Sequence, residues 1–127
     1  MIDFTYQSLP GRVVFGPGKL AVVKAEAEHL GIKRALVLST PHQRNLADDV
    51  AARLGELAVG IYDQAVMHVP AETVAGAMKV VTELEIDGCV SIGGGSTVGL
   101  AKAIALETGL PILAIPSTYS GSEMTPV

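Results

Sequence analysis

The pattern that most constrains the fold is an alternation of short apolar runs with longer segments of helical periodicity. Residues 35–38 (ALVL) and 112–115 (ILAI) are apolar throughout. Such runs are typical of strands that are buried on both faces of a parallel sheet. Helical segments separate the runs, so the sequence predicts an α/β domain: a Rossmann-like parallel sheet with crossover helices.

The individual elements can be placed from apolar spacing and from glycine and proline positions. Strands are expected at residues 12–15, 35–38, 57–62, 89–92 and 112–115. Helices are expected over residues 20–30, from Asn45 to residue 54, from Pro70 through Val81, and over residues 97–107. Asn45 is expected to be an N-cap, with Asp48 in the first turn of its helix. Glycines follow three of these helices and are expected to end them: Gly31, Gly55 and Gly109.

Composition excludes several classes of protein. The chain has 127 residues, of which 49% are hydrophobic and 17% charged, which suits one domain with a core and excludes intrinsic disorder. A net charge of −4 disfavours nucleic-acid binding. A single cysteine, Cys89, excludes an internal disulfide framework and is expected to be a core residue. No leader or membrane-spanning stretch is evident, so we expect a soluble cytoplasmic protein without a membrane partner.

The most informative segment for function is residues 89–102, CVSIGGGSTVGLAK. A buried strand is expected to end at Ile92, and Ser96 to open a helix after the turn of Gly93, Gly94 and Gly95. Glycines let backbone amides approach a ligand, and a helix N-terminus attracts anions, so this turn suits a pyrophosphate. The spacing is neither GxGxxG nor that of a P-loop. The alternative is a glycine turn that only permits tight packing of strand on helix.

Hydroxyl groups gather at the ends of two other expected strands. Residues 117–125 follow the strand at 112–115 and are rich in Ser and Thr, although an ordinary polar loop has the same composition. Ser39 and Thr40 follow the strand at 35–38, where an acidic residue would bind a ribose 2′-hydroxyl and exclude a 2′-phosphate. With hydroxyls there and Arg44 nearby, we predict that a dinucleotide is accepted with or without a 2′-phosphate.

These motifs together resemble the iron-containing (group III) alcohol dehydrogenase family, which is related to dehydroquinate synthase and glycerol dehydrogenase. The matching segments are residues 14–18 (VFGPG), the GGGS turn with Lys102 after it, and residues 121–125 (GSEMT). The likeness is greatest to the family's maleylacetate reductase branch, on residues 67–70 (MHVP), on Gly99 where metal-dependent branches usually carry Asp, and on a shortened Ser/Thr loop. The resemblance implies the N-terminal NAD(P)-binding domain, residues 1–127, of a dehydroquinate synthase-like two-domain fold.

The resemblance also implies an activity and site residues. It implies NAD(P)H-dependent reduction of the double bond of maleylacetate to 3-oxoadipate, in the degradation of aromatic compounds. Gly94, Gly95 and Ser96, with Gly93 beside them, would hold the pyrophosphate. The nucleotide would be lined by residues of the Ser/Thr loop: Ser117, Thr118, Tyr119 and Ser122.

Some expectations concern parts outside this chain. The chain stops at Val127 in an uncharged segment, residues 124–127, so we expect a piece of a longer protein. Its catalytic residues are expected beyond Val127, in a helical C-terminal domain that is absent from this chain. The family's metal ligands belong to that domain, and we assign no metal here. His68 is a candidate contact for the dicarboxylate substrate, or a plain loop histidine.

The quaternary state and the alternatives complete these expectations. A homodimer is expected from relatives. One alternative is a metal-dependent alcohol or glycerol dehydrogenase, for which an Asp and three His would follow Val127. The other alternative is a stand-alone nucleotide-binding module, for which the protein would end at Val127.

Overall fold

The computed structural model describes residues 4–8, 11–15, 22–66 and 71–115, which form one six-stranded sheet with helices on both faces. The strands are β1 (Phe4–Ser8), β2 (Gly11–Phe15), β3 (Ala35–Leu38), β4 (Ala58–Tyr62), β5 (Gly88–Ile92) and β6 (Ile112–Ile115). Their order in the sheet is β1-β2-β6-β5-β3-β4. Only β1 is antiparallel to its neighbour, β2, and the other described strand pairs are parallel.

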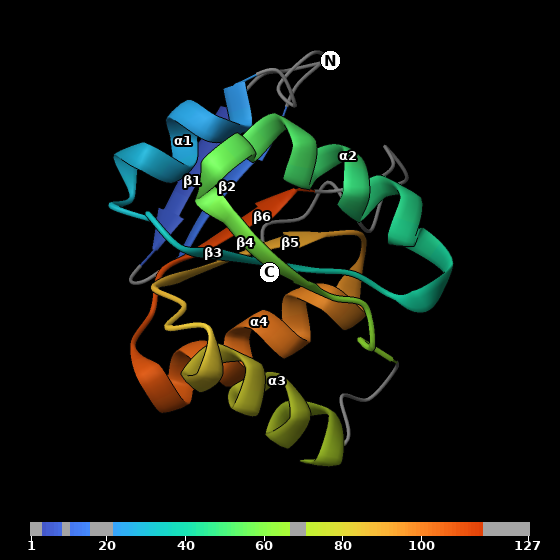
Figure 1. Ribbon diagram of the computed structural model, residues 1–127. Helices are drawn as coiled ribbons and strands as arrows, with labels where there is room; N and C mark the ends of the chain where they lie inside the picture. The colour runs from blue at the N-terminus through green and yellow to red at the C-terminus, as the bar shows by residue number, and fades with distance from the viewer. Residues whose placement is uncertain (1–3, 9–10, 16–21, 67–70, 116–127) are drawn as a thin grey trace.

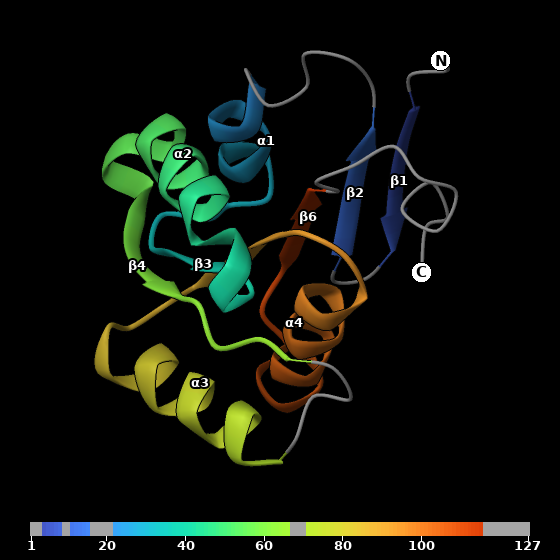
Figure 2. The ribbon, with the colours of Figure 1, turned by 90° about the vertical axis from the view of Figure 1, so that its right-hand side faces the viewer.

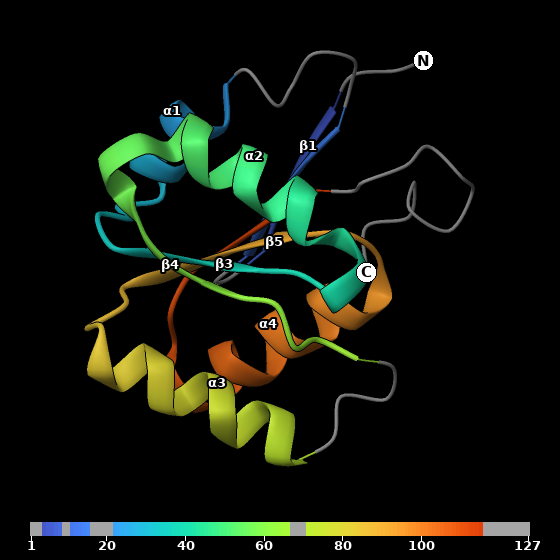
Figure 3. The ribbon, with the colours of Figure 1, turned by 45° about the vertical axis from the view of Figure 1, so that its right-hand side comes forward.

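Two pairs of helices form the outer layers (Figures 1 and 3). On one face, α1 (Val23–His29) contacts α2 (Arg44–Leu54). On the other face, α3 (Ala71–Glu83) contacts α4 (Gly95–Thr108). Figure 2 shows β2 and β1 extending the sheet past β6, on the side away from β4. None of the helices in the described ranges is long and apolar enough to cross a membrane.

Alternate residues of each central strand enter two separate cores. In β3, Ala35 and Val37 pack under α1 and α2, whereas Leu36 and Leu38 pack against α3 and α4. All four β3 side chains are fully buried, as expected for a strand with helices on both faces. The apolar runs of the sequence are therefore explained by burial on two faces, and the predicted α/β fold is confirmed.

The predicted elements are confirmed with small shifts at their ends, whereas the expected helix starts at residue 20 and Pro70 lie outside the described residues. Gly55 and Gly109 end α2 and α4 in left-handed backbone conformations, with φ of +61° and +75°. The hairpin partner β1 was not predicted, because residues 4–8 (FTYQS) have no long apolar run. Its pairing with β2 depends on a neighbouring strand rather than on its own pattern.

The expected start of α2 is wrong. A 3₁₀-helix at Pro41–Gln43 runs directly into α2, so Gln43 is the N-cap and Asn45 lies inside the helix. Asp48 consequently lies beyond the first turn, where it accepts a hydrogen bond from Arg44 Nε at 3.1 Å. The carboxylate thus forms an ion pair four residues apart on the helix and does not serve the helix start.

Candidate functional site at the carboxyl ends of the central strands

The predicted phosphate turn lies where the direction of the chain crossovers reverses. β3 and β5 are parallel neighbours, with Leu38 opposite Ser91. The chain leaves β3 toward α2 on one face of the sheet and leaves β5 toward α4 on the other. Ligands of open α/β sheets bind at such a point, outside the carboxyl ends of the two strands. The segments that follow β3 and β5 are therefore the candidate site.

Gly93 is the glycine of this turn that the backbone requires. Its φ is +131°, a value that residues with a side chain rarely adopt. An added Cβ would lie 2.5 Å from Gln43 Oε1 and 3.3 Å from Thr97 Oγ1. Its N–H donates to the Ile115 carbonyl oxygen at 3.1 Å. Gly93 thus lets the turn pack closely between the segment after β3 and the end of β6.

The glycines at 94 and 95 leave the start of α4 open. Gly94 is the N-cap of α4 and has no side chain with which to accept a bond from the first amides of the helix. Gly95 is exposed, and an added Cβ would meet no atom of the described residues within 4 Å. The nearby hydroxyl of Thr97 donates to the Gly94 carbonyl oxygen at 2.9 Å and so caps no amide. An anion placed on this turn would therefore meet backbone N–H groups that no side chain of the described residues caps.

The predicted residues after β3 lie beside this turn and differ in exposure. Ser39 is fully buried, and its Oγ has no hydrogen-bond partner within the described part of the chain. Thr40 is half-buried and donates from Oγ1 to Gln43 Oε1 at 3.3 Å. A buried hydroxyl without a partner is one that an ordered water or a bound polar group would satisfy. This unsatisfied hydroxyl and the open helix start fit a polar, phosphate-containing ligand.

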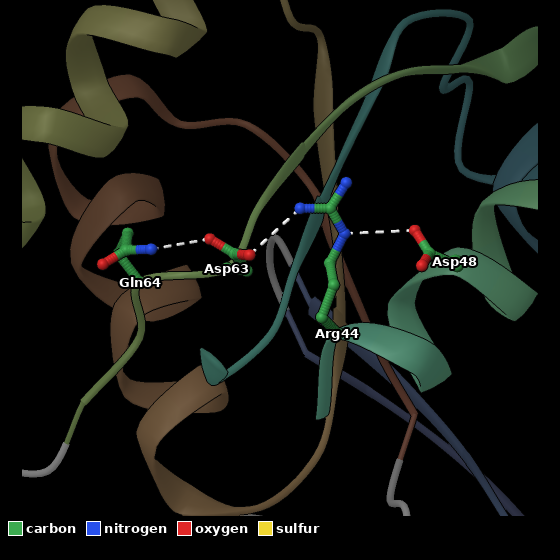
Figure 4. A network of polar contacts seen from close by, with 4 residues as sticks. All are labelled: Arg44, Asp48, Asp63 and Gln64. Carbon is green, nitrogen blue, oxygen red and sulfur yellow. Dashed lines mark hydrogen bonds and ion pairs between the residues drawn. The ribbon is translucent and has the colours of Figure 1, made fainter. Parts of the chain in front are cut away.

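A network of charged side chains adjoins the same segment (Figure 4). Arg44 donates from Nε to Asp48 and from Nη1 to Asp63, at 3.1 and 3.0 Å. Gln64 Nε2 donates to the other oxygen of Asp63 at 2.7 Å. The hydrogen bonds from Gln64 and Arg44 lower the pKa of Asp63, and those to Asp48 and Asp63 raise the pKa of Arg44.

Sequence reasoning did not single out Asp63 or Gln64. The signal was present, because both residues directly follow the strand predicted at 57–62, at the same edge of the sheet as Ser39. Backbone hydrogen bonds bring these segments together. The N–H of Ser39 donates to the Tyr62 carbonyl oxygen at 3.0 Å, and its carbonyl oxygen accepts from the Ala65 N–H at 3.1 Å.

Several predicted site residues fall outside the described ranges. These are His68 and the Ser/Thr loop, with Ser117, Thr118, Tyr119 and Ser122. Val127 also lies outside the described residues, and the catalytic residues expected beyond Val127 are not part of this sequence. The described residues therefore contain the predicted cofactor turn but not the predicted catalytic groups, whose position beyond Val127 stays a prediction.

Cys89, Lys102, His29 and His42 differ in their burial. Cys89 is buried as expected, and burial raises the pKa of its thiol to about 12. Lys102 is exposed on α4, as are His29 and His42 on their own segments. Within the described residues, no group of three or more His, Cys, Asp or Glu side chains could hold a metal ion.

Comparison with known proteins identifies the family. The family model described as iron-containing alcohol dehydrogenase matches residues 10–127. The chain belongs to this family. A maleylacetate reductase of Sphingobium indicum is 54% identical over 126 residues, which are 99% of this chain and 36% of that protein. The chain therefore spans about 36% of the length of this curated relative.

Solved structures of other proteins share the fold. The crystal structure of maleylacetate reductase from Agrobacterium tumefaciens superposes with a TM-score of 0.83 at 48% identity, covering 99% of this chain and 36% of that one. A sulfoacetaldehyde reductase from Bifidobacterium kashiwanohense, solved in complex with NAD⁺, is 22% identical with a TM-score of 0.75, covering 96% and 38%. The resemblance predicted from the motifs is thereby confirmed at the level of the family, and the fold as that of its N-terminal part.

Proposed function

We propose that the complete protein carrying this chain reduces the carbon–carbon double bond of maleylacetate to give 3-oxoadipate, with NADH or NADPH as the reductant. The observation that carries the proposal is the 54% identity to a maleylacetate reductase over nearly the whole chain. The aligned residues include both layers of helices and the turn at residues 93–96, which supports a common use of the site. The open start of α4 at the carboxyl ends of the strands adds physical support.

In this proposal the chain is the nucleotide-binding part of the enzyme. The backbone of Gly94, Gly95 and Ser96 would hold the pyrophosphate, with Gly93 shaping the turn. Thr40 and the buried hydroxyl of Ser39 would face the nucleotide from the end of β3, and the loop residues Ser117, Thr118, Tyr119 and Ser122 from the end of β6. The bound cofactor supplies the hydride, while the protein supplies position and electrostatics.

The groups for catalysis and for most of the substrate binding are proposed to lie in the rest of the protein. The relative from Sphingobium indicum is nearly three times as long as this chain, because the chain covers 36% of it. We propose that a helical C-terminal domain, beyond Val127, supplies the catalytic groups and, with His68, holds the two carboxylates of the substrate. We place the enzyme in the cytoplasm as a homodimer, in the degradation of aromatic compounds.

A second candidate is a metal-dependent alcohol or glycerol dehydrogenase. The description of the matching family model, iron-containing alcohol dehydrogenase, favours it. Gly99 favours the first candidate, because the resemblance implies that the metal-dependent branches carry an Asp at this position. The two candidates differ in their need for a metal.

The test is an assay of the complete protein, following the absorbance of reduced nicotinamide with and without a chelator. We expect maleylacetate to be reduced by NADH or NADPH at a rate that the chelator does not change, with 3-oxoadipate identified by mass spectrometry. Oxidation of glycerol or a simple alcohol that is lost with the chelator, together with no turnover of maleylacetate, would establish the second candidate instead.

A further inference from the structure

The network around Arg44 adjoins Gln43, whose side chain lies against the phosphate turn. Gln43 accepts a hydrogen bond from Thr40 and stands against Gly93, and Arg44 is the next residue along the chain. On the other side, Asp63 belongs to the segment that is hydrogen-bonded to both backbone groups of Ser39. The network therefore borders the segment after β3, where a nucleotide ribose is expected if the pyrophosphate lies on the first turn of α4.

The guanidinium of Arg44 is held in place and still has donors to offer. An arginine carries five N–H donors in a fixed plane. Two of them are used, from Nε to Asp48 and from Nη1 to Asp63. Nη2 makes no hydrogen bond within the described residues, and Figure 4 shows it pointing away from both carboxylates. The side chain is about half exposed, at 48%, so that solvent or a ligand can reach it.

The charges in the network act on an incoming phosphate group in opposite directions, because one attracts it and two repel it. One guanidinium and two carboxylates give the group a net charge of −1. A 2′-phosphate of NADP carries negative charge, so it is attracted by Arg44 and repelled by Asp63 and Asp48. Loss of either carboxylate charge would bring the net charge to zero and would weaken the repulsion of the phosphate, while the other carboxylate still holds Arg44.

We propose that Arg44 and Asp63 together determine how the site distinguishes NADP from NAD, Arg44 by donating to the 2′-phosphate and Asp63 by opposing it. This inference rests on the proposed nucleotide-binding function and names its specificity residues. It gives a physical basis to acceptance of both cofactors, because the attraction and the repulsion come from neighbouring groups. Asp48 holds Arg44 from the helix side and acts in the same direction as Asp63.

The test measures equilibrium binding of NAD⁺ and NADP⁺ to the complete protein by calorimetry, so that it does not depend on turnover. R44Q is expected to raise the ratio of the NADP⁺ to the NAD⁺ dissociation constant by about tenfold, the loss of one charge-assisted hydrogen bond. D63N is expected to lower that ratio severalfold. If circular dichroism shows that D63N alters the fold, D48N applies the same test of lost negative charge.

A matched control lies on the same helix. Arg53 and Asp49 form an ion pair four residues apart at 3.5 Å, with exposures similar to those of Arg44 and Asp48. D49N should therefore leave the ratio as in the wild type. Ratios within about twofold of the wild type for both R44Q and D63N would overturn the inference, as would a wild type that binds neither dinucleotide. A protein that binds both but does not reduce maleylacetate would disprove the proposed function alone.

Discussion

Substitution of Gly93 or Gly95 by alanine should separate folding from ligand binding in the same turn. At Gly93 the φ of +131° is strained for any residue with a side chain, and a new Cβ would lie 2.5 Å from Gln43 Oε1. Such backbone strain costs about 1–3 kcal/mol. Gln43 can rotate away only by giving up the hydrogen bond from Thr40. We therefore expect G93A to lower the free energy of unfolding by about 1–3 kcal/mol.

At Gly95 we expect the opposite result, in which stability is kept and nucleotide binding is weakened. The residue is the first of α4, and a Cβ there would touch no atom within 4 Å in the part of the chain that the structure describes. Alanine favours helix over glycine by up to about 1 kcal/mol in helix interiors, so G95A should be as stable as the wild type or slightly more. The new methyl group would nevertheless stand where a phosphate must approach the backbone amides. We expect the dissociation constant for NAD⁺ to rise about tenfold or more.

Both variants can be measured in the complete protein by urea unfolding and by calorimetric titration with NAD⁺. The expected pattern is a destabilised G93A and a stable G95A that binds weakly. Binding by G95A within about twofold of the wild type would refute the placement of the pyrophosphate on α4. Unchanged stability of G93A would refute the argument from its backbone conformation.

Three further predictions concern the start of β5, at the opposite end of this strand from the site. G88A should destabilise the protein by about 1–3 kcal/mol, because an added Cβ would lie 2.6 Å from Ile32 Cδ1 in a buried strand; an unfolding free energy equal to that of the wild type would contradict this. D87A should cost about 1 kcal/mol in the same assay, since the carboxylate accepts the backbone N–H groups of residues 33–34 at 2.8–3.1 Å. Burial raises the pKa of the Cys89 thiol to about 12, so Cys89 should resist alkylation at about pH 8 until urea unfolds the protein. Alkylated Cys89 found by peptide mapping of native protein would contradict this.

The central part of the fold could be predicted because its strands are buried on both faces. The run at Ala35–Leu38 has no polar residue, and β6 begins and ends where the apolar run at 112–115 does. The start of α2 could not be predicted from Asn45, a good capping residue, because Pro41 begins a 3₁₀-helix that continues into α2. Local preference for a cap was overridden by the path of the chain.

The sequence predicts where the candidate site lies in the fold better than it predicts the contacts within it. The strand–glycine–helix pattern places residues 93–96 correctly, but only the structure distinguishes Gly93, with its positive φ, from the open Gly95. The ion pairs of Arg44 join α2 to the residue after β4, nineteen positions along the chain. Such contacts depend on the register of β3 with β4, which residue spacing alone does not specify.

The most direct test of the account is a crystal structure of the complete protein with NAD⁺ bound. We expect the pyrophosphate oxygens to accept hydrogen bonds from the backbone amides at the start of α4, residues 94–96, with the adenosine ribose beside Thr40. A pyrophosphate held away from this turn, with the first amides of α4 in contact with solvent, would contradict it.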